Sequence, residues 1–213
     1  MRRFFAGMIA AALVAAVAAC GSSGGSTNKT SGGVDQVKVG VIPIVDVAPI
    51  YLGQQKGFFT NRKIQLTMES GQGGAAIVPG VVSGQFQFGF SNITSLLIAQ
   101  TKNVPIKVVA NGVASTGKTG ADFGGVVVRK DSPIKTAADL AGKKIAVNTL
   151  KNIGDTTTRD SVRKAGGDPS TINFVEMSFA NMPAAVANGQ VDAAFVVEPS
   201  LSAVTGAGGR VVS

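Results

Sequence analysis

The chain has 213 residues, a formal net charge of +8, one cysteine and no histidine. Without histidine, the sequence excludes the usual general base, the Ser-His-Asp and Cys-His nucleophile systems and every metal site that includes histidine. The basic residues are scattered among Asp and Glu, which indicates surface solvation near anionic lipid more than nucleic-acid binding. We therefore expect a binding protein and not an enzyme, with no catalytic residue, no metal and no cofactor.

The first residues predict a secretory signal. Arg2 and Arg3 precede an uncharged, Ala-rich run that ends at residue 19, and this run is shorter than the roughly 17 to 25 residues that a membrane-spanning helix needs. Residues 17–20 look like a bacterial lipobox, in which the cysteine sulfur receives a lipid. We predict a signal peptide over residues 1–19 and lipidation of Cys20. The alternative is an ordinary signal peptide in which this cysteine is incidental.

Residues 20–36 predict a flexible leash. After the cysteine they are dominated by Gly, Ser, Thr and Asn, which cannot bury enough apolar area to fold. A coil of this length spans roughly 20 to 24 Å. A diacylglycerol on Cys20 supplies the two acyl chains that stable anchoring takes. The domain that follows is then tethered and able to reach a neighbour in the same membrane.

Strands and helices alternate along the rest of the chain. The first series has strands over residues 37–42, 64–68, 86–90 and 104–111, with helices over residues 47–55 and 93–102 and a short helix that ends at residue 82. A strand over residues 123–129 leads to a second series. That series has strands over residues 144–148, 173–175, 191–197 and 209–213, and helices over residues 155–165 and 182–188. This alternation predicts an α/β fold with parallel sheets and helices on their faces.

The two series predict two lobes of similar construction. Residues 79–86 and 183–191 are alike, and Gly84 and Gly189 each end a helix before a strand. The alternative is that a helix, a glycine cap and a strand are common in any α/β protein. We place lobe 1 at residues 37–125 and lobe 2 at residues 126–213.

Four segments carry a family resemblance: residues 48–59, 82–89, 139–147 and 189–194. With them, the chain resembles the solute-binding proteins of the sulfonate, taurine, nitrate and thiamine-pyrimidine-precursor importers. The resemblance implies a two-lobed periplasmic-binding-protein-like (type II) fold, with the ligand between the lobes and the chain crossing between them twice. Only the outward crossing is present, so we expect a C-terminally incomplete fold. The first lobe then has an open sheet edge, which predicts poor solubility.

The candidate ligand-binding residues follow from the predicted strands, because the carboxyl ends of parallel strands line the binding crevice. Lobe 1 offers Pro43, Ile44, Asp46, Gly71, Gln72, Gly73, Ser91 and Asn92, and lobe 2 offers Asn148, Thr149, Asp155, Thr156, Thr157 and Glu198.

Several of these residues stand where a helix begins, so free backbone N–H groups can converge there on a sulfonate, nitrate or carboxylate. The alternative is that Ser, Asn, Asp and Thr act there only as helix caps. Asp46 and Glu198 are acids that can accept an ammonium or amidine-like group; the alternatives are a cap for Asp46 and a solvated strand end for Glu198. The chain has no tryptophan and one tyrosine, which counts against a stacked pyrimidine ligand.

The sequence predicts an extracytoplasmic solute-binding lipoprotein of an ABC importer, which captures a small anionic or zwitterionic solute of the aliphatic sulfonate, taurine or nitrate type. Its expected partners are that solute, the permease and ATPase subunits and, through the lipid anchor, the membrane; we expect a monomer. Its expected location is the cell envelope, on the outer face of the cytoplasmic membrane or in the periplasm. The alternatives are a binder of a thiamine pyrimidine precursor and a sensory lipoprotein. An enzyme on the same scaffold is disfavoured because its relatives use histidine and iron.

Overall fold

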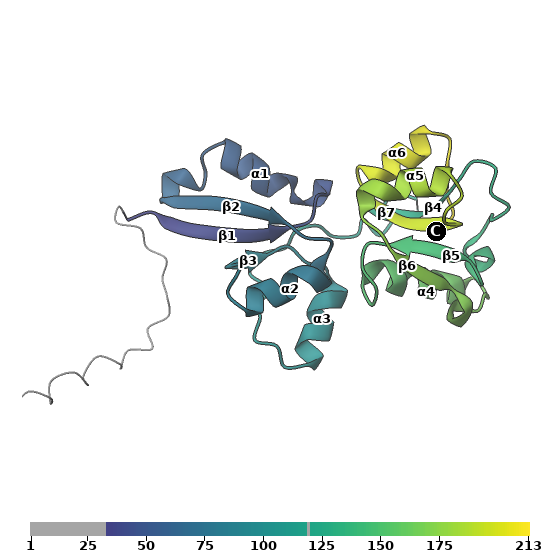
Figure 1. The fold of residues 1–213 in the computed structure, drawn as a ribbon, viewed down its shortest axis with the longest axis horizontal. Coiled ribbons are helices and arrows are strands. Elements are labelled where there is room, and N and C mark those ends of the chain that lie inside the picture. Colours follow the sequence, from purple (N-terminus) through teal and green to yellow (C-terminus); the bar gives the residue numbers. More distant parts are fainter. Residues whose placement is uncertain (1–32, 119) are drawn as a thin grey trace, which may run out of the picture.

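Two β-sheets, each covered by helices, form two lobes that lie side by side in the computed structural model (Figure 1). The structure describes residues 33–118 and 120–213. The predicted signal peptide, Cys20 and most of the predicted leash lie outside these residues. Among the residues that are described, no helix has both the length and the apolarity to cross a membrane.

The first lobe contains a sheet of three parallel strands in the order β2, β1, β3. Strand β1 covers Asp35–Val41, β2 covers Ile64–Ser70 and β3 covers Phe88–Gly89. Val39 stands opposite Met68 on one side and Phe88 on the other. Strand β1 begins two residues before the strand that we predicted, so the last residues of the predicted leash belong to the sheet.

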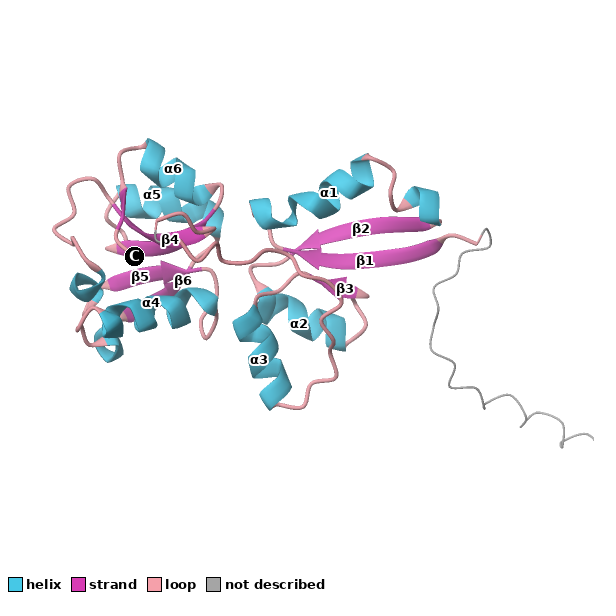
Figure 2. Cartoon of the chain, turned by 180° about the vertical axis from the view of Figure 1, so that it is seen from behind, coloured by secondary structure: helices cyan, strands magenta, loops and turns pink. Residues whose placement is uncertain are grey.

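Helices cover both faces of this first sheet. Helix α1 (Ala48–Gln55) lies on one face, and α2 (Gly74–Val82) and α3 (Ile93–Thr101) lie on the other (Figure 2). Short 3-10 turns, η1 and η2, cover Val45–Val47 and Thr60–Arg62. Helix α3 begins where predicted because the side chain of Asn92 accepts a hydrogen bond from the Ser95 N–H at 3.1 Å.

The strand predicted over residues 104–111 is wrong. These residues form an irregular segment, in which Val108 and Val109 are 68% and 71% exposed. Strand β3 pairs with β1 along one edge, and no described strand pairs with its other edge. The alternating apolar pattern records a preference for extended backbone, but a strand also needs a neighbour for its hydrogen bonds.

The second lobe contains a sheet of five strands in the order β6, β5, β7, β4, β8. The strands cover Gly124–Val128 (β4), Lys144–Val147 (β5), Asn173–Glu176 (β6), Ala193–Val197 (β7) and Arg210–Val211 (β8). Strands β5, β6 and β7 are parallel, as predicted, but β4 is antiparallel to both β7 and β8. The chain enters β4 directly from the first lobe and not through a helical crossover, so nothing forces a parallel direction.

Helix α4 (Ile153–Lys164) covers one face of this second sheet, and α5 (Met182–Ala187) and α6 (Ser200–Gly206) cover the other (Figures 1 and 2). The 3-10 turns η3, η4 and η5 cover Ala137–Leu140, Pro169–Thr171 and Phe179–Asn181. All residues of β7 are buried, so the centre of this sheet is also the centre of the larger hydrophobic core. The order β6, β5, β7 repeats the order β2, β1, β3 of the first sheet.

Candidate ligand-binding site

A cavity of about 390 Å³ has walls from both lobes, and we call it the inter-lobe cavity. This volume suits a small molecule, since ligand pockets usually measure about 300 to 1,000 Å³. It lies at the carboxyl ends of β2, β5 and β6, where open parallel sheets place their ligands. Its walls are formed by Gln72, Ala75 and Ala76 of the first lobe and by Asn148, Thr149, Glu176, Met177 and Ser178 of the second.

The wall from the first lobe is the beginning of helix α2. Gly73 is the N-cap and has no side chain to occupy the free N–H groups of the first turn. Among the described residues, no acceptor lies on the N–H of Gly74 or Ala75. The positive end of the helix dipole therefore meets the cavity together with unused donors.

The wall from the second lobe carries two buried polar side chains, which follow strand β5. Asn148 is 5% exposed and Thr149 is 7% exposed. The Asn148 Nδ2 donates to the Gln72 carbonyl at 2.9 Å, which is a hydrogen bond between the lobes. In the part of the chain that the structure describes, the buried Oδ1 of Asn148 has no partner. The Thr149 Oγ1 accepts a hydrogen bond from the Asn152 Nδ2.

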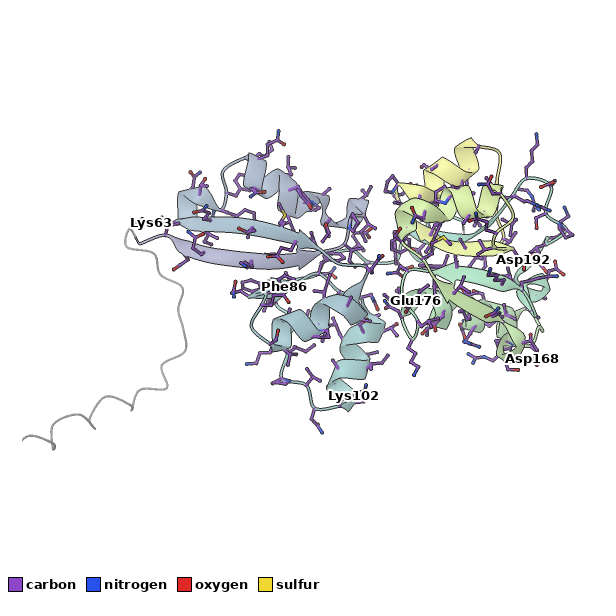
Figure 3. All side chains as sticks on the ribbon, in the orientation of Figure 1. Lys63, Phe86, Lys102, Asp168, Glu176 and Asp192 are labelled. Carbon is purple, nitrogen blue, oxygen red and sulfur yellow. The ribbon has the colours of Figure 1, made fainter. Side chains whose placement is uncertain are left out.

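Glu176, at the end of β6, is the one charged residue in the described lining of the inter-lobe cavity. Its Oε1 accepts a hydrogen bond from the Leu150 N–H at 2.6 Å, which holds the carboxylate beside the loop after β5. In Figure 3 Glu176 lies on the side of the second lobe that faces the first, whereas Asp168 and Asp192 lie away from it. A carboxylate in this wall suits a ligand that carries a cationic group.

Further contacts join the two lobes beside the cavity. The Ser95 Oγ, in α3, donates to the Asn152 Oδ1 at 3.1 Å, and the Val45 N–H donates to the Glu198 carbonyl at 3.1 Å. The backbone of Gly73 approaches the second lobe so closely that a Cβ there would lie 2.5 Å from the Asn148 Nδ2. The lobes therefore also touch through polar groups that are not part of the cavity lining.

Among the predicted site residues, Gln72, Asn148 and Thr149 line the inter-lobe cavity, and Gly73 borders it. Gly71 and Ser91 lie beside α2: a Cβ on Gly71 would lie 2.8 Å from Ile77, and one on Gly74 would touch the Ser91 hydroxyl.

Other predicted residues are occupied by local hydrogen bonds. Asn92 caps α3, and the Asp155 carboxylate accepts from the Asn152 and Lys151 N–H groups at 2.8 and 2.9 Å. The Glu198 carboxylate accepts from the N–H and the hydroxyl of Ser202 at 3.1 and 2.9 Å.

Two further predicted residues lie within α4, outside the lining of the cavity. The Thr157 hydroxyl donates to the Ile153 carbonyl at 2.7 Å, and the exposed Thr156 donates its N–H to the Asn152 carbonyl at 3.1 Å. A role for any of these residues in ligand binding remains a proposal.

Three predicted residues lie between β1 and α1. Pro43 is exposed, and Ile44 packs against the larger core. Asp46 lines a second cavity of about 480 Å³ within the first lobe, between the sheet and residues 105–112. Burial there raises the pKa of Asp46 above its ordinary value.

The sequence reasoning missed Glu176, Met177 and Ser178. Strand β6 was predicted; Glu176 is its last residue, and Met177 and Ser178 follow it directly. The rule that selected Asn148 and Thr149 at the end of β5 therefore also selects these residues when it is applied to β6. Within the described residues, no group of three or more His, Cys, Asp or Glu side chains is arranged to hold a metal ion.

The fold is shared with solved solute-binding proteins. The alkanesulfonate-binding protein SsuA from Xanthomonas axonopodis pv. citri, bound to MOPS, is 25% identical, with a TM-score of 0.71 over 84% of this chain and 60% of that one. The periplasmic aliphatic sulphonate binding protein SsuA from Escherichia coli is 21% identical, with a TM-score of 0.59 over the same shares. The nitrate-binding protein NrtA from Synechocystis PCC 6803 is 20% identical, with a TM-score of 0.64 over 84% of this chain and 51% of that one.

These matches confirm the predicted periplasmic-binding-protein-like α/β fold, and the chain spans 60% of the length of both SsuA structures. No curated protein matches the sequence. The model of the family described as "NMT1/THI5 like" matches residues 44–208, which is well over half of the chain. The chain therefore belongs to the NMT1/THI5-like family.

Proposed function

We propose that this protein is the solute-binding component of an ABC importer and captures a small anionic or zwitterionic solute between its lobes. The observation that carries the proposal is the inter-lobe cavity, whose walls come from both lobes and contain unused hydrogen-bonding groups. A ligand there contacts both lobes at once and stabilises the arrangement in which they touch. The permease then recognises that arrangement, and the ATPase drives uptake.

The chemistry of the walls suggests how such a solute is held. The N–H groups at the start of α2 suit a sulfonate or carboxylate, because both charge and free donors favour an anion there. The Glu176 carboxylate, across the cavity, suits an ammonium group. Taurine carries both groups in one small molecule, whereas nitrate offers only the first.

We also propose that the protein is a lipoprotein. A signal peptide over residues 1–19 and lipidation at Cys20 would anchor a monomer to the outer face of the cytoplasmic membrane or in the periplasm, with the residues from Cys20 to the start of β1 at Asp35 as the leash. Replacement of Cys20 by serine is expected to move the protein from the detergent phase to the aqueous phase when a detergent extract of the membranes is separated into two phases. Equal partitioning of the two forms would refute the anchor.

A pyrimidine precursor of thiamine is a second ligand to test. No aromatic side chain is found in the described lining of the inter-lobe cavity, which leaves a pyrimidine ring without a stacking partner. A sensory lipoprotein that binds the same solute would differ in its partner, so co-purification of a permease distinguishes the two roles.

Calorimetric titration of the chain with taurine, ethanesulfonate, nitrate, sulfate and hydroxymethylpyrimidine tests the proposal. A ligand present at 100 times its Kd adds about 2.7 kcal/mol of stability, which a thermal melt also detects. Binding of taurine or ethanesulfonate supports the proposed ligand class, and binding of the pyrimidine alone replaces it. Absence of heat and of a thermal shift with all five compounds refutes that class.

A further inference from the structure

A continuous set of hydrogen bonds runs from the first lobe to the inter-lobe cavity. The Asn92 Nδ2 donates to the Ser95 Oγ at 3.4 Å, and the Ser95 Oγ donates across the lobes to the Asn152 Oδ1 at 3.1 Å. The Nδ2 of Asn152 donates in turn to the Oγ1 of Thr149, which lines the cavity. Asn152 is thus the residue of this set whose side-chain hydrogen bonds reach both the opposite lobe and the cavity wall.

The surroundings of Asn152 fix the direction of its amide. The side chain is fully buried, at 0% exposure. Its Oδ1 accepts from the Ser95 hydroxyl and also from the Ile153 N–H at 2.8 Å, where it acts as the N-cap of α4. The backbone N–H of Ile153 can only donate, so a reversed Asn152 amide would place two N–H groups against each other. The Nδ2 of Asn152 must therefore point to Thr149.

This direction determines what Thr149 offers to a ligand. A hydroxyl that accepts a hydrogen bond from Asn152 keeps its own proton for another partner. Among the described residues, no acceptor takes that proton, although Thr149 is only 7% exposed. The N-cap of α2 lies against the same hydroxyl, since a Cβ on Gly73 would be 3.0 Å from the Thr149 Oγ1. The Thr149 hydroxyl and the first turn of α2, which carries the free N–H groups, therefore lie next to each other in the wall of the cavity.

We infer that Asn152 is a positioning residue that aims the Thr149 hydroxyl as a donor at an anionic oxygen of the ligand and couples this contact to closure of the lobes through Ser95. The inference rests on the proposed function, in which the inter-lobe cavity holds the solute. A ligand that engages Thr149 then strengthens the bond between the lobes, because hydrogen bonds in a buried network polarise one another. Opening of the lobes breaks the Ser95–Asn152 hydrogen bond and leaves the orientation of the Thr149 hydroxyl less fixed.

A double-mutant cycle on Ser95 and Thr149 tests this coupling, with the Kd of taurine and of ethanesulfonate as the readout. We expect Thr149→Val to weaken binding about tenfold and Ser95→Ala about threefold, by loss of one hydrogen bond each. In the Thr149→Val background, Ser95→Ala should change the Kd by less than about twofold. Additive effects in the cycle would overturn the inference.

Two further variants separate positioning from general damage. Thr149→Ser keeps the hydroxyl and should retain the affinity of the wild type, whereas retained affinity in Thr149→Val would contradict a ligand contact. Ser83→Ala is the matched control, because the Ser83 hydroxyl donates within the first lobe to the Gly80 carbonyl at 3.1 Å. It should leave the Kd unchanged.

A ligand-free measurement keeps the inference distinct from the proposed ligand class. In the chain with Cys20→Ser, fluorescent labels on Lys102→Cys and Lys164→Cys report the distance between the exposed regions at the ends of α3 and α4. Ser95→Ala should lower the energy transfer, and should lower it less when Thr149→Val is present. If no solute binds the wild type, the proposed ligand class fails, but the energy-transfer measurement still tests the coupling between Ser95 and Thr149. Unchanged energy transfer in Ser95→Ala would overturn that coupling.

Discussion

Gly73 is the position where a single methyl group should separate the lobes. Its φ of 173° is extended backbone that alanine also adopts, so Gly73→Ala acts through contacts and not through backbone strain. The added Cβ would lie 2.5 Å from the Asn148 Nδ2, 3.0 Å from the Thr149 Oγ1 and 3.3 Å from the Asn152 Nδ2. These three neighbours belong to the second lobe, so the methyl group acts as a wedge between the lobes.

The size of the effect follows from the closest of these distances. Ordinary van der Waals contact begins near 3.4 Å, so the lobes must separate by about 0.9 Å or the buried side chains must move. Overpacking of this kind costs about 1 to 3 kcal/mol. If this cost falls on the closed arrangement, the affinity for a solute drops by about 5- to 150-fold.

Calorimetric titration with the solute that the wild type binds measures this loss. Gly73→Ser is the informative second variant, because serine adds a side-chain N-cap to α2 but carries the same Cβ, and it should therefore bind as weakly as the alanine variant. Gly206→Ala is the control, since a Cβ at Gly206 meets no atom within 4 Å. Wild-type affinity in Gly73→Ala, or recovery of affinity in Gly73→Ser, would refute the wedge.

Three other predictions concern separate parts of the chain. Glu176→Gln keeps the acceptor for the Leu150 N–H but removes the charge, so it should reduce the preference for taurine over ethanesulfonate about tenfold in paired titrations; an unchanged preference would exclude contact with an ammonium. Burial raises the pKa of Asp46 in the folded protein above its ordinary value of 3.8. The protonated side chain therefore stabilises the fold fully below pH 3.8, and this stabilisation is lost as the pH rises through the raised pKa. Asp46→Asn should therefore raise the melting temperature at pH 7, and the difference from the wild type should vanish towards pH 3.8; a constant difference contradicts this. Val109→Lys places a charge on the exposed segment that lines the second cavity together with Phe88 of β3, the strand that pairs on one edge only among the described residues. It should reduce self-association in light scattering, whereas an unchanged mass would exclude this edge as the site of self-association.

The alternation of helices and strands could be predicted because each element carries its own local pattern. Residues 145–147 are apolar, and in the structure they are the buried part of β5, which begins at the exposed Lys144. Helix α6 was missed because Ser200–Gly206 consists mostly of small residues, and its few larger apolar residues do not show a clear helical spacing. The orientation of β4 and the irregular path of residues 104–111 depend on which strands are neighbours, and the local sequence does not encode that information.

The candidate site was predictable as far as strand ends define it. Gln72, Asn148 and Thr149 follow from the rule for parallel sheets. Asp155 fits the same rule, but its carboxylate closes a capping box with Asn152. Whether such a residue caps a helix or contacts a ligand depends on how far it lies from the other lobe, and the sequence does not give that distance. The link from Ser95 to Asn152 joins residues 57 positions apart, so it was visible only in three dimensions.

The two lobes differ in how well their interiors are protected. Strand β7 is buried along its whole length, whereas both residues of β3 are exposed and the first sheet is narrower. Amide hydrogens of the first lobe should therefore exchange through openings that leave the second lobe folded. Heating then gives two transitions and not one, and a solute that touches both walls should merge them into a single cooperative event.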